Sequence, residues 1–293
     1  IVNPTITTEY SVTVTDINSC TYIPLSTIVN VYDSIPLNLG EDIVTCFGDE
    51  ILLDAGSYVS YLWSNDSIIQ TILISNTSEY SVTITDVNNC QASDLVNVFF
   101  VEPPAIEICF VEFDSFSLKN KIKWNQQDLN INNINIYRET STDNYVLIGT
   151  IPNAETSFID ENSAPQSQSY SYKLSVVDTC GNQGMLSDFH KTITLLSAYD
   201  ENTNTYGFTW SSYMGLPISN YYLFGITNTN ETIMIDEIPG SSNFYNYINP
   251  SSEFTRYYIG FYIEPCNSKS QYFVKSNIIN SHSAINNIKL SNF

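Results

Sequence analysis

A stretch of thirteen residues occurs twice in this chain and constrains its fold more than any other feature. Residues 8–20 and 78–90 are identical at 9 of 13 positions, at a constant offset of 70, and the remaining positions are conservative exchanges. In the second copy Tyr80, Val82 and Ile84 alternate with hydroxyl side chains, which is the pattern of a half-buried β-strand. A repeat of this length predicts a duplicated β-domain.

Short strands with turn residues between them continue along the chain, without helical periodicity. This pattern predicts an all-β protein of tandem antiparallel β-sandwich domains. We expect the C-terminal part of a truncated repeat at 1–35, a complete unit of the same kind at 36–102, two domains of a second kind at 103–196 and 197–280, and a tail or linker at 281–293.

The two domains of the second kind are related by an apparent offset of 86 residues. The pairs that share it are Trp124 and Trp210, Ile136 and Tyr222, Phe158 and Phe244, Tyr172 and Tyr258, and Cys180 and Cys266. Each complete domain also contains one Trp, at 63, 124 or 210. A single indole in a sandwich is most often a core residue, so we interpret all three as core residues.

The charge of the chain is strongly acidic, with a formal net charge of −21. Its first Lys or Arg is Lys119, so the preceding residues carry acids alone. Such a surface repels nucleic acid and anionic lipid, and we expect neither as a partner. No window is apolar enough to span a membrane. Because no Asp-x-Asp-x-Asp-Gly loop occurs, we interpret the acids as a solvated surface and predict no metal and no cofactor.

The six cysteines are widely spaced, contain no Cys-x-x-Cys, and are accompanied by only two His, which argues against a zinc site. Scattered cysteines in a β-rich chain predict an exported protein with disulfides inside its domains. We expect each bond to join an early strand of a unit to its late turn. The predicted bonds are Cys46–Cys90 and Cys109–Cys180, with Cys20 unpaired and Cys266 free or intermolecular.

Several segments resemble a known group of bacterial proteins. The segments 46–56, 61–64 and 80–90 resemble Ig-like repeats of large exported Bacteroidetes proteins, the gliding-motility-associated and type IX secretion cargo proteins. The segments 136–139, 175–182 and 190–193 resemble the fibronectin type III-like domains of the same proteins. The resemblance implies an Ig-like domain followed by two fibronectin type III-like domains, an extracellular or outer-surface location, and a chain cut at both ends, since the usual sorting domain is absent.

Catalytic motifs such as Gly-x-Ser-x-Gly and His-Glu-x-x-His are absent. We interpret His190 as an exposed or hydrogen-bonded strand residue, since a lone His without a positioned nucleophile makes no triad. The adjacent acids at 41–42 and 49–50 do not show the facing geometry of glycosidase carboxylates. We therefore expect no enzymatic activity.

Tyrosines are the stronger lead to a binding site. Tyr221-Tyr222 and Tyr257-Tyr258 each place one ring on either face of a strand, so one ring of each pair belongs to the core. An exposed ring stacks on a sugar or anchors a protein partner, which makes these four tyrosines candidate ligand contacts.

Two serines lie in predicted turns with the sequence Asp-Ser-Ile. Ser34 and Ser67 resemble the O-glycosylation sites of exported Bacteroidetes proteins. We expect both to be reachable by a modifying enzyme, because turns lie at the surface.

The sequence supports three hypotheses for function. The first is a non-catalytic structural or adhesive stalk whose partners are the neighbouring domains of the same chain, with a surface glycan or protein as an external partner. The second is a carbohydrate-binding accessory region of a secreted enzyme. The third is an enzyme in its own right. Coplanar exposed aromatic rings favour the second, and converging His, Asp and Ser side chains favour the third.

Overall fold

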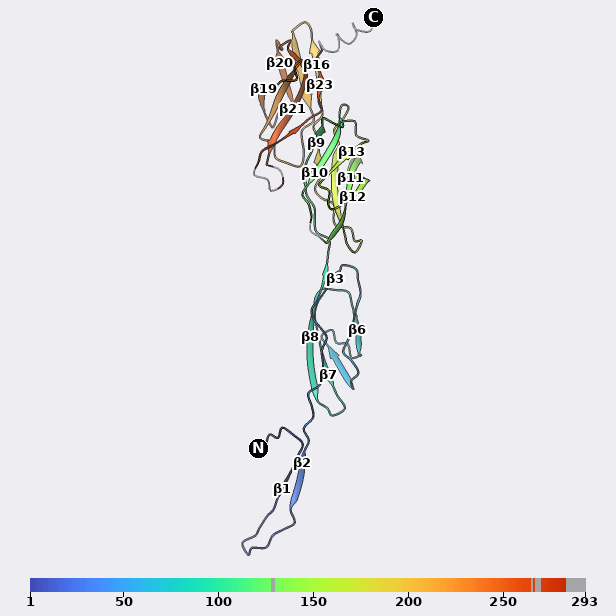
Figure 1. The fold of residues 1–293 in the computed structure, drawn as a ribbon, viewed down its shortest axis with the longest axis vertical. Coiled ribbons are helices and arrows are strands. Elements are labelled where there is room, and N and C mark those ends of the chain that lie inside the picture. The colour runs from blue at the N-terminus through green and yellow to red at the C-terminus, as the bar shows by residue number, and fades with distance from the viewer. Residues whose placement is uncertain (128–129, 265, 267–269, 283–293) are drawn as a thin grey trace. The chain divides into compact units, whose positions relative to one another are not determined.

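The computed structural model describes residues 1–127, 130–264, 266 and 270–282. The chain divides into two compact units, Ile1–Val101 and Glu102–Phe293. Both units consist of β-strands joined by turns (Figure 1), which confirms the all-β prediction. The described residues contain no helix with the length and hydrophobicity needed to cross a membrane.

The first unit contains a two-stranded hairpin followed by an Ig-like sandwich. The hairpin pairs β1 (Thr8–Val12) with β2 (Leu25–Val29). In the sandwich, one sheet has the order β3-β8-β7-β5 and the other pairs β4 with β6. Its strands are β3 (Ile43–Cys46), β4 (Ile51–Asp54), β5 (Ser60–Trp63), β6 (Thr71–Ile74), β7 (Ser78–Thr85) and β8 (Gln91–Val101).

The alternation that predicted a strand in the repeat is visible on β7. Tyr80, Val82 and Ile84 are buried in the sandwich core beside Trp63, while the hydroxyl residues between them are partly exposed. β3 runs parallel to β8, with Cys46 opposite the last residue of that strand. This pair is an exception to the antiparallel arrangement predicted for the whole sheet.

An aspartate at or directly after a β-paired residue builds the same turn three times. In Asp16, Asp86 and Asp178 the Oδ1 atom accepts hydrogen bonds from the backbone N–H groups two and four residues later, at 2.7–2.9 Å. The third residue after each aspartate has a positive φ, between 60° and 89°. This geometry explains why Asp-x-Asn-x-Cys follows the strand in both copies of the repeat.

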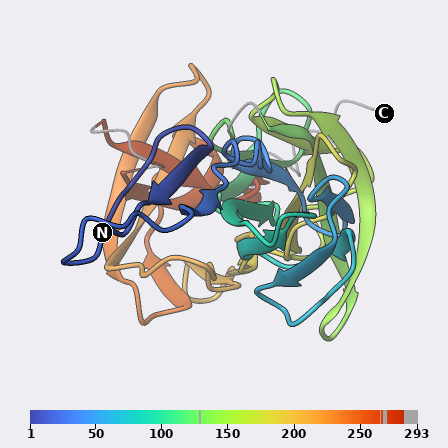
Figure 2. The ribbon, with the colours of Figure 1, turned by 90° about the horizontal axis from the view of Figure 1, so that it is seen from below.

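The second unit begins with a sandwich that we call the central domain. Its sheets have the orders β13-β10-β9 and β12-β11-β14-β15. The strands are β9 (Ile108–Asp114), β10 (Lys119–Trp124), β11 (Ile131–Ser141), β12 (Asn144–Pro152), β13 (Ser157–Asp160), β14 (Ser171–Asp178) and β15 (His190–Lys191). The long β11–β12 hairpin is drawn in yellow-green (Figure 2).

The sandwich that follows is the last domain. Its sheets have the orders β16-β17-β20 and β19-β18-β21-β22, and β23 also pairs with β21. The strands are β16 (Leu195–Asp200), β17 (Thr205–Trp210), β18 (Asn220–Thr227), β19 (Thr232–Pro239), β20 (Phe244–Ile248), β21 (Phe254–Ile263), β22 (Tyr272–Lys275) and β23 (Ile279–Asn280). The end of the predicted tail, 283–293, lies outside the described residues.

The single offset of 86 does not hold throughout the two domains. Trp124 and Trp210 are equivalent, because both are buried at the ends of β10 and β17. In the other sheet, the fully buried cross-strand pair Ile136–Leu174 corresponds to Leu223–Ile259. These positions give offsets of 223 − 136 = 87 and 259 − 174 = 85.

The predicted match of Ile136 with Tyr222 is therefore wrong by one residue. Since side chains alternate between faces along a strand, a shift of one residue exchanges the core side for the solvent side. Ile136 is fully buried, whereas Tyr222 is partly exposed. By the same correction, Tyr172 corresponds to Tyr257 rather than to Tyr258.

Candidate functional site

Strand β9 attaches the central domain to the last domain through four consecutive residues. Cys109 forms a disulfide with Cys266, with 5.3 Å between the Cα atoms. The ring of Phe110 stacks on Tyr272 at 4.7 Å between centroids. The Tyr272 hydroxyl donates a hydrogen bond of 2.7 Å to Glu112. We call these contacts, together with the one made by Val111, the β9 clamp.

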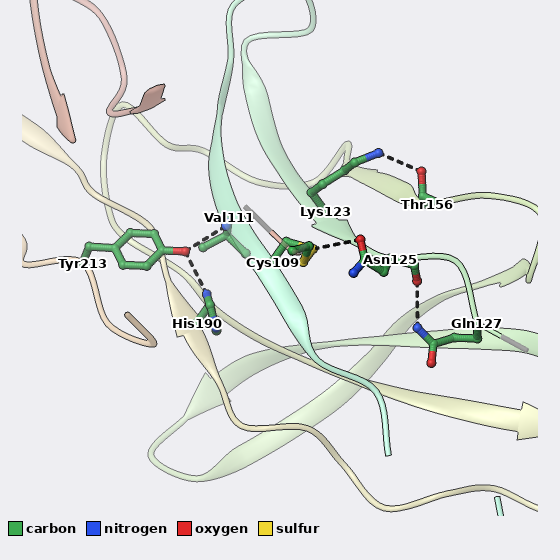
Figure 3. Close-up of a disulfide and its surroundings, with 9 residues drawn as sticks. Cys109, Val111, Lys123, Asn125, Gln127, Thr156, His190 and Tyr213 are labelled. Carbon is green, nitrogen blue, oxygen red and sulfur yellow. Dashed lines mark hydrogen bonds between the residues drawn. A yellow bond between two sulfur atoms is a disulfide. The ribbon is translucent and has the colours of Figure 1, made fainter. Parts of the chain in front are cut away.

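Val111 completes the clamp through its backbone. Its N–H group donates to the Tyr213 hydroxyl at 3.0 Å, and His190 Nδ1 lies 2.8 Å from the same oxygen (Figure 3). Burial lowers the pKa of His190 to about 4, although Asp188 acts in the opposite direction. The imidazole is therefore neutral at pH 7, and it serves as a packed hydrogen-bonding group between β15 and the loop after β17.

Glu112 is the one carboxylate of the clamp. It is buried, and its Oε2 atom has no hydrogen-bond partner among the described residues. Burial raises the pKa of Glu112, while the hydrogen bond from Tyr272 and the charges of Lys275 and Lys121 oppose that effect. Among the described residues, the Glu112 carboxylate therefore has Tyr272 as its hydrogen-bond partner and no other group with which to exchange a proton.

The predicted Cys46–Cys90 disulfide is wrong. Cys90 is a free thiol, and Cys46 is a disulfide-bonded cysteine. Cys46 lies opposite Val101 at the end of β8, whereas Cys90 immediately precedes the start of that strand. Eleven residue steps of strand separate Cys90 from Val101, a distance of about 36 Å. A disulfide requires Cα atoms within about 7 Å, so this pair cannot form.

The predicted Cys109–Cys180 bond is also wrong, because Cys109 pairs with Cys266 instead. Cys266 follows β21, and the aromatic contact between Phe110 and Tyr272 holds this part of the last domain against β9. Cys180 is not a free thiol, while Cys20 is free and exposed, as expected. Spacing did not reveal a bond that joins two domains.

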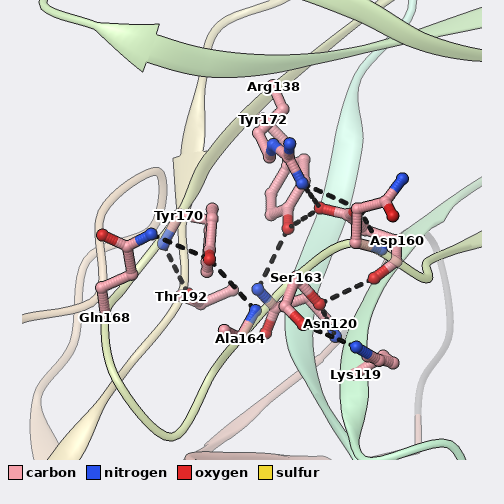
Figure 4. Close-up of polar contacts among 11 residues, drawn as sticks. Lys119, Asn120, Arg138, Asp160, Ser163, Ala164, Gln168, Tyr170, Tyr172 and Thr192 are labelled. Carbon is pink, nitrogen blue, oxygen red and sulfur yellow. Dashed lines mark hydrogen bonds and ion pairs between the residues drawn. The ribbon is translucent and has the colours of Figure 1, made fainter.

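A buried polar network lies in the central domain (Figure 4). Arg138 forms an ion pair with Asp160 at 2.8 Å, and the Tyr172 hydroxyl donates to the same carboxylate at 2.8 Å. Asn120 donates to the Tyr172 hydroxyl at 3.0 Å. Burial raises the pKa of Tyr172, and the charge of Asp160 raises it further. Arg138, Asp160 and Tyr172 satisfy one another, while Asn120 Oδ1 is buried without a partner among the described residues. We interpret the network as a structural tie between the two sheets.

The four predicted tyrosines occupy different environments. Tyr221 is 1% exposed and its hydroxyl accepts a hydrogen bond from the backbone N–H of Tyr213, so its proposed contact with a ligand at the surface is wrong. Tyr257 is equally buried, at 1% exposed, but it lines a small pocket. Tyr222 and Tyr258 lie partly exposed on the opposite, outer face of the sheet.

The outer face of the last domain carries an aromatic cluster that sequence reasoning found only in part. Tyr258 stacks on Phe224 at 5.1 Å, and Phe273 meets Phe224 and Tyr262 edge to face at 5.3 and 4.8 Å. Tyr222 also meets Tyr262 edge to face. Apart from the stacked pair of Phe224 and Tyr258, these rings meet at steep angles rather than forming a coplanar row, so this face does not have the geometry of a flat sugar platform.

The two candidate glycosylation sites differ in exposure. Ser34 is exposed in an irregular segment, whereas Ser67 is partly buried. The backbone of Ser67 is also held on both sides: its carbonyl accepts from Trp63, and its N–H donates to Asn65. Modification of either serine remains a prediction, and Ser34 is the more accessible of the two.

The remaining candidates for chemistry are not brought together. In the part of the chain that the structure describes, no three His, Cys, Asp or Glu side chains are placed to hold a metal ion. His190 is the hydrogen-bonded strand residue described above, and among the described residues its ring is paired with Tyr213 rather than with a serine or cysteine nucleophile. The described residues therefore offer a structural clamp, an aromatic face and a small pocket.

Comparison with known proteins finds solved structures that are similar to this chain at low sequence identity. No protein-family model matches the chain, and no curated protein matches it. A fibronectin type III-like protein from Clostridium thermocellum is 22% identical over 31% of this chain and 93% of its own, with a TM-score of 0.28. A segment of a 1.5-MDa bacterial ice-binding adhesin is 11% identical over 84% of this chain and 98% of its own, with a TM-score of 0.31.

A tandem repeat from the extending region of a large adhesion protein is also similar. It is 13% identical over 94% of this chain and 81% of its own, with a TM-score of 0.23. We assign the fold from the sheets of this chain rather than from these likenesses.

Proposed function

We propose that this chain is a non-catalytic structural or adhesive stalk segment of a large secreted or cell-surface bacterial protein. The observation that carries the proposal is the disulfide of the β9 clamp. It joins residues 157 positions apart, and the segment between them contains the strands from β10 to β21, which make up most of both sandwiches of the second unit. A pulling force applied at the two ends of that unit passes through the disulfide and does not load the enclosed strands.

The composition supports the same role. Disulfides persist in oxidising compartments, which favours an extracellular location. The acidity of the first unit keeps neighbouring copies apart. Its partners are then the adjoining domains of the same chain, with a surface glycan or protein as an external partner. We include in this proposal export through a type IX system and a link to gliding motility. Both rest on the resemblance of the repeats to those of exported Bacteroidetes proteins.

Single-molecule force spectroscopy tests the proposal on the full chain. With the disulfide intact, we expect residues 110–265 to contribute no extension. Cys180, within that segment, is itself disulfide-bonded, so the comparison is made in a Cys180→Ser background. There Cys266→Ser adds about 530 Å of contour length, at roughly 3.4 Å for each of the 157 residue steps between Cys109 and Cys266. Cys20→Ser is the matched control, since Cys20 is a free thiol. An equal extension in the oxidised chain and in Cys266→Ser would contradict a force-shielding role.

A second measurement addresses catalysis. The purified chain is assayed against panels of glycosides, peptides and esters, and we expect no turnover. Turnover that disappears in His190→Gln, while the fold is retained, would overturn the assignment as a non-catalytic segment.

A further inference from the structure

A small pocket opens at one end of the last domain. Its volume is about 160 Å³, and it lies beside the β16–β17 turn and the loop that precedes β21. Its lining residues are Tyr199, Asn204, Tyr206, Pro250, Ser251, Ser252, Phe254, Tyr257 and His282. The pocket is smaller than the usual cavities for drug-sized ligands, which suits the entry of a single ring.

Tyr257 distinguishes this pocket from a packing defect. It is 1% exposed, and its hydroxyl makes no hydrogen bond within the described part of the chain. Burial raises its pKa, and neighbouring tyrosines raise it further, so the hydroxyl keeps its proton. The hydroxyl is unpaired but is not among the fully enclosed unpaired atoms of the described residues, so a ligand in the pocket that carries a polar group can hydrogen-bond to it.

The equivalent residue of the central domain shows what Tyr257 lacks. Tyr172 donates to Asp160 and accepts from Asn120. Asn120 pairs with Asp160 across β10 and β13, and the equivalent cross-strand pair of β17 and β20 is Tyr206 with Tyr247. The last domain has therefore replaced both polar partners by aromatic residues.

The hydroxyl groups of these replacements are occupied elsewhere. The Tyr206 hydroxyl accepts from the backbone N–H of His282, and the Tyr247 hydroxyl accepts from the backbone N–H of Ser251. Neither one is donated to Tyr257. The positions that hold the polar network in the central domain thus carry aromatic rings in the last domain, where Tyr206 and Tyr257 line the pocket.

The chemistry of the walls selects the class of ligand. Tyr206 and Tyr257 supply apolar ring surface, and Asn204, Ser251 and Ser252 supply polar groups at the rim. No carboxylate, Lys or Arg is among the lining residues, and the imidazole of the lining residue His282 lies 3.2 Å from Glu201 Oε1, outside the lining. A neutral ring with an apolar face and hydroxyl groups at its edge matches this distribution.

We propose that this pocket binds one neutral pyranose ring, such as the terminal sugar of a surface glycan. The apolar face of the sugar packs against the tyrosine rings, and one of its hydroxyl groups pairs with the Tyr257 hydroxyl. Asn204 is held in place for a further contact, because its Oδ1 atom accepts from Tyr199 at 2.7 Å and its Nδ2 donates to Asn249 at 3.1 Å. This inference does not depend on the mechanical role of the clamp.

The test is a nuclear magnetic resonance titration of the full chain with glucose, galactose, mannose and N-acetylglucosamine. We expect at least one sugar to shift the backbone amide signals of Asn204, Ser251 and Ser252 at millimolar concentration. Tyr257→Phe keeps the ring and removes the hydroxyl, and we expect it to weaken binding by roughly 2- to 10-fold, the worth of one hydrogen bond. Tyr222→Phe, on the outer aromatic face, is the matched control and leaves binding unchanged.

Three outcomes would overturn the proposal. The first is the absence of any shift at the pocket with all four sugars. The second is binding that is equally strong in Tyr257→Phe and in the unmodified chain. The third is a response to tetramethylammonium in place of the sugars, which would identify the rings as a cation-binding cage. In each variant, retained signal dispersion establishes that the last domain is folded.

Discussion

The central and last domains share one strand plan but hold the same buried tyrosine in different ways. In the central domain, Tyr172 lies in a network with Asn120 and the Arg138–Asp160 ion pair. In the last domain, Tyr257 is surrounded by rings, with Tyr206 at 5.2 Å and Phe208 at 5.1 Å. Both solutions bury a tyrosine almost completely.

The polar surroundings of Tyr172 and the aromatic surroundings of Tyr257 together indicate how a pocket arises in a packed fold. A network of charged and amide groups needs every member, because a lost partner leaves a buried polar group unpaired. Aromatic rings tolerate the loss, since their stability comes from apolar contact. The last domain has retained the tyrosine without its polar partners, and the result is one free hydroxyl beside open space.

The disulfide that joins the two domains should give the largest effect on their stability. In Cys266→Ser, we expect the free energy of unfolding of the second unit to fall by about 4–5 kcal/mol, because a loop of more than 100 residues gains freedom when unfolded. The two domains should then unfold in separable transitions, which denaturant titration followed by the fluorescence of Trp124 and Trp210 would detect. Unchanged, coincident transitions would show that the noncovalent contacts alone couple the domains.

Removal of the Asp160 carboxylate tests whether the central domain depends on its polar network more than the last domain depends on the equivalent residue. We expect Asp160→Ala to destabilise the central domain by about 3–5 kcal/mol, because Arg138 and Tyr172 lose a buried partner. The equivalent position in the last domain is Tyr247, and Tyr247→Phe should cost under about 1 kcal/mol. Chemical denaturation of the two variants compares them, and similar losses would refute the distinction between the domains.

The contact between His190 and Tyr213 predicts a pH dependence of the junction. The pKa of His190 is about 4 in the folded state, against an ordinary value of 6.5, so the unfolded state binds more protons between these values. Stability is therefore fully present above pH 6.5 and is lost as the pH falls towards 4, by up to about 3 kcal/mol.

Measurement of unfolding free energy from pH 7 to pH 4 checks this expectation, with His190→Gln expected to flatten the profile. Asp188 opposes the shift of the His190 pKa. Glu112 has a raised pKa, so its contribution favours the folded state at low pH and declines as the pH rises. Glu112→Gln is the control that removes this opposite slope. A profile that is the same in the parent chain and in His190→Gln would exclude the histidine as its source.

The smallest expected effect compares the two tyrosine hydroxyls. Tyr172→Phe should destabilise the central domain by about 1–3 kcal/mol, since Asp160 and Asn120 each lose a hydrogen bond. Tyr257→Phe should be close to neutral, because its hydroxyl has no partner to lose. Thermal unfolding of the two variants provides the comparison. A larger loss for Tyr257→Phe would show that its hydroxyl is paired in solution.

Part of the candidate site was accessible from sequence. The doubled tyrosines of β18 and β21 indicated that one ring of each pair faces the core, and the structure places Tyr221 and Tyr257 there. The sequence did not indicate Phe273, which joins the outer cluster from β22. It also did not indicate the pocket, whose lining comes from turns and strands that approach one another only in the folded domain.

By itself, the sequence determined the β-strands, the turns between them and the sandwich class of the fold. These features depend on neighbours in the chain, as the alternation on β7 and the turn built by Asp86 show. Only the tertiary structure decided the partner of Cys109 and the equivalence of Tyr172 with Tyr257. The first depends on contact between two domains, and the second on a one-residue shift that exchanges the faces of a strand. The spacing of residues along the chain predicts neither the partner of Cys109 nor the equivalence of Tyr172 with Tyr257, because packing between distant segments sets both.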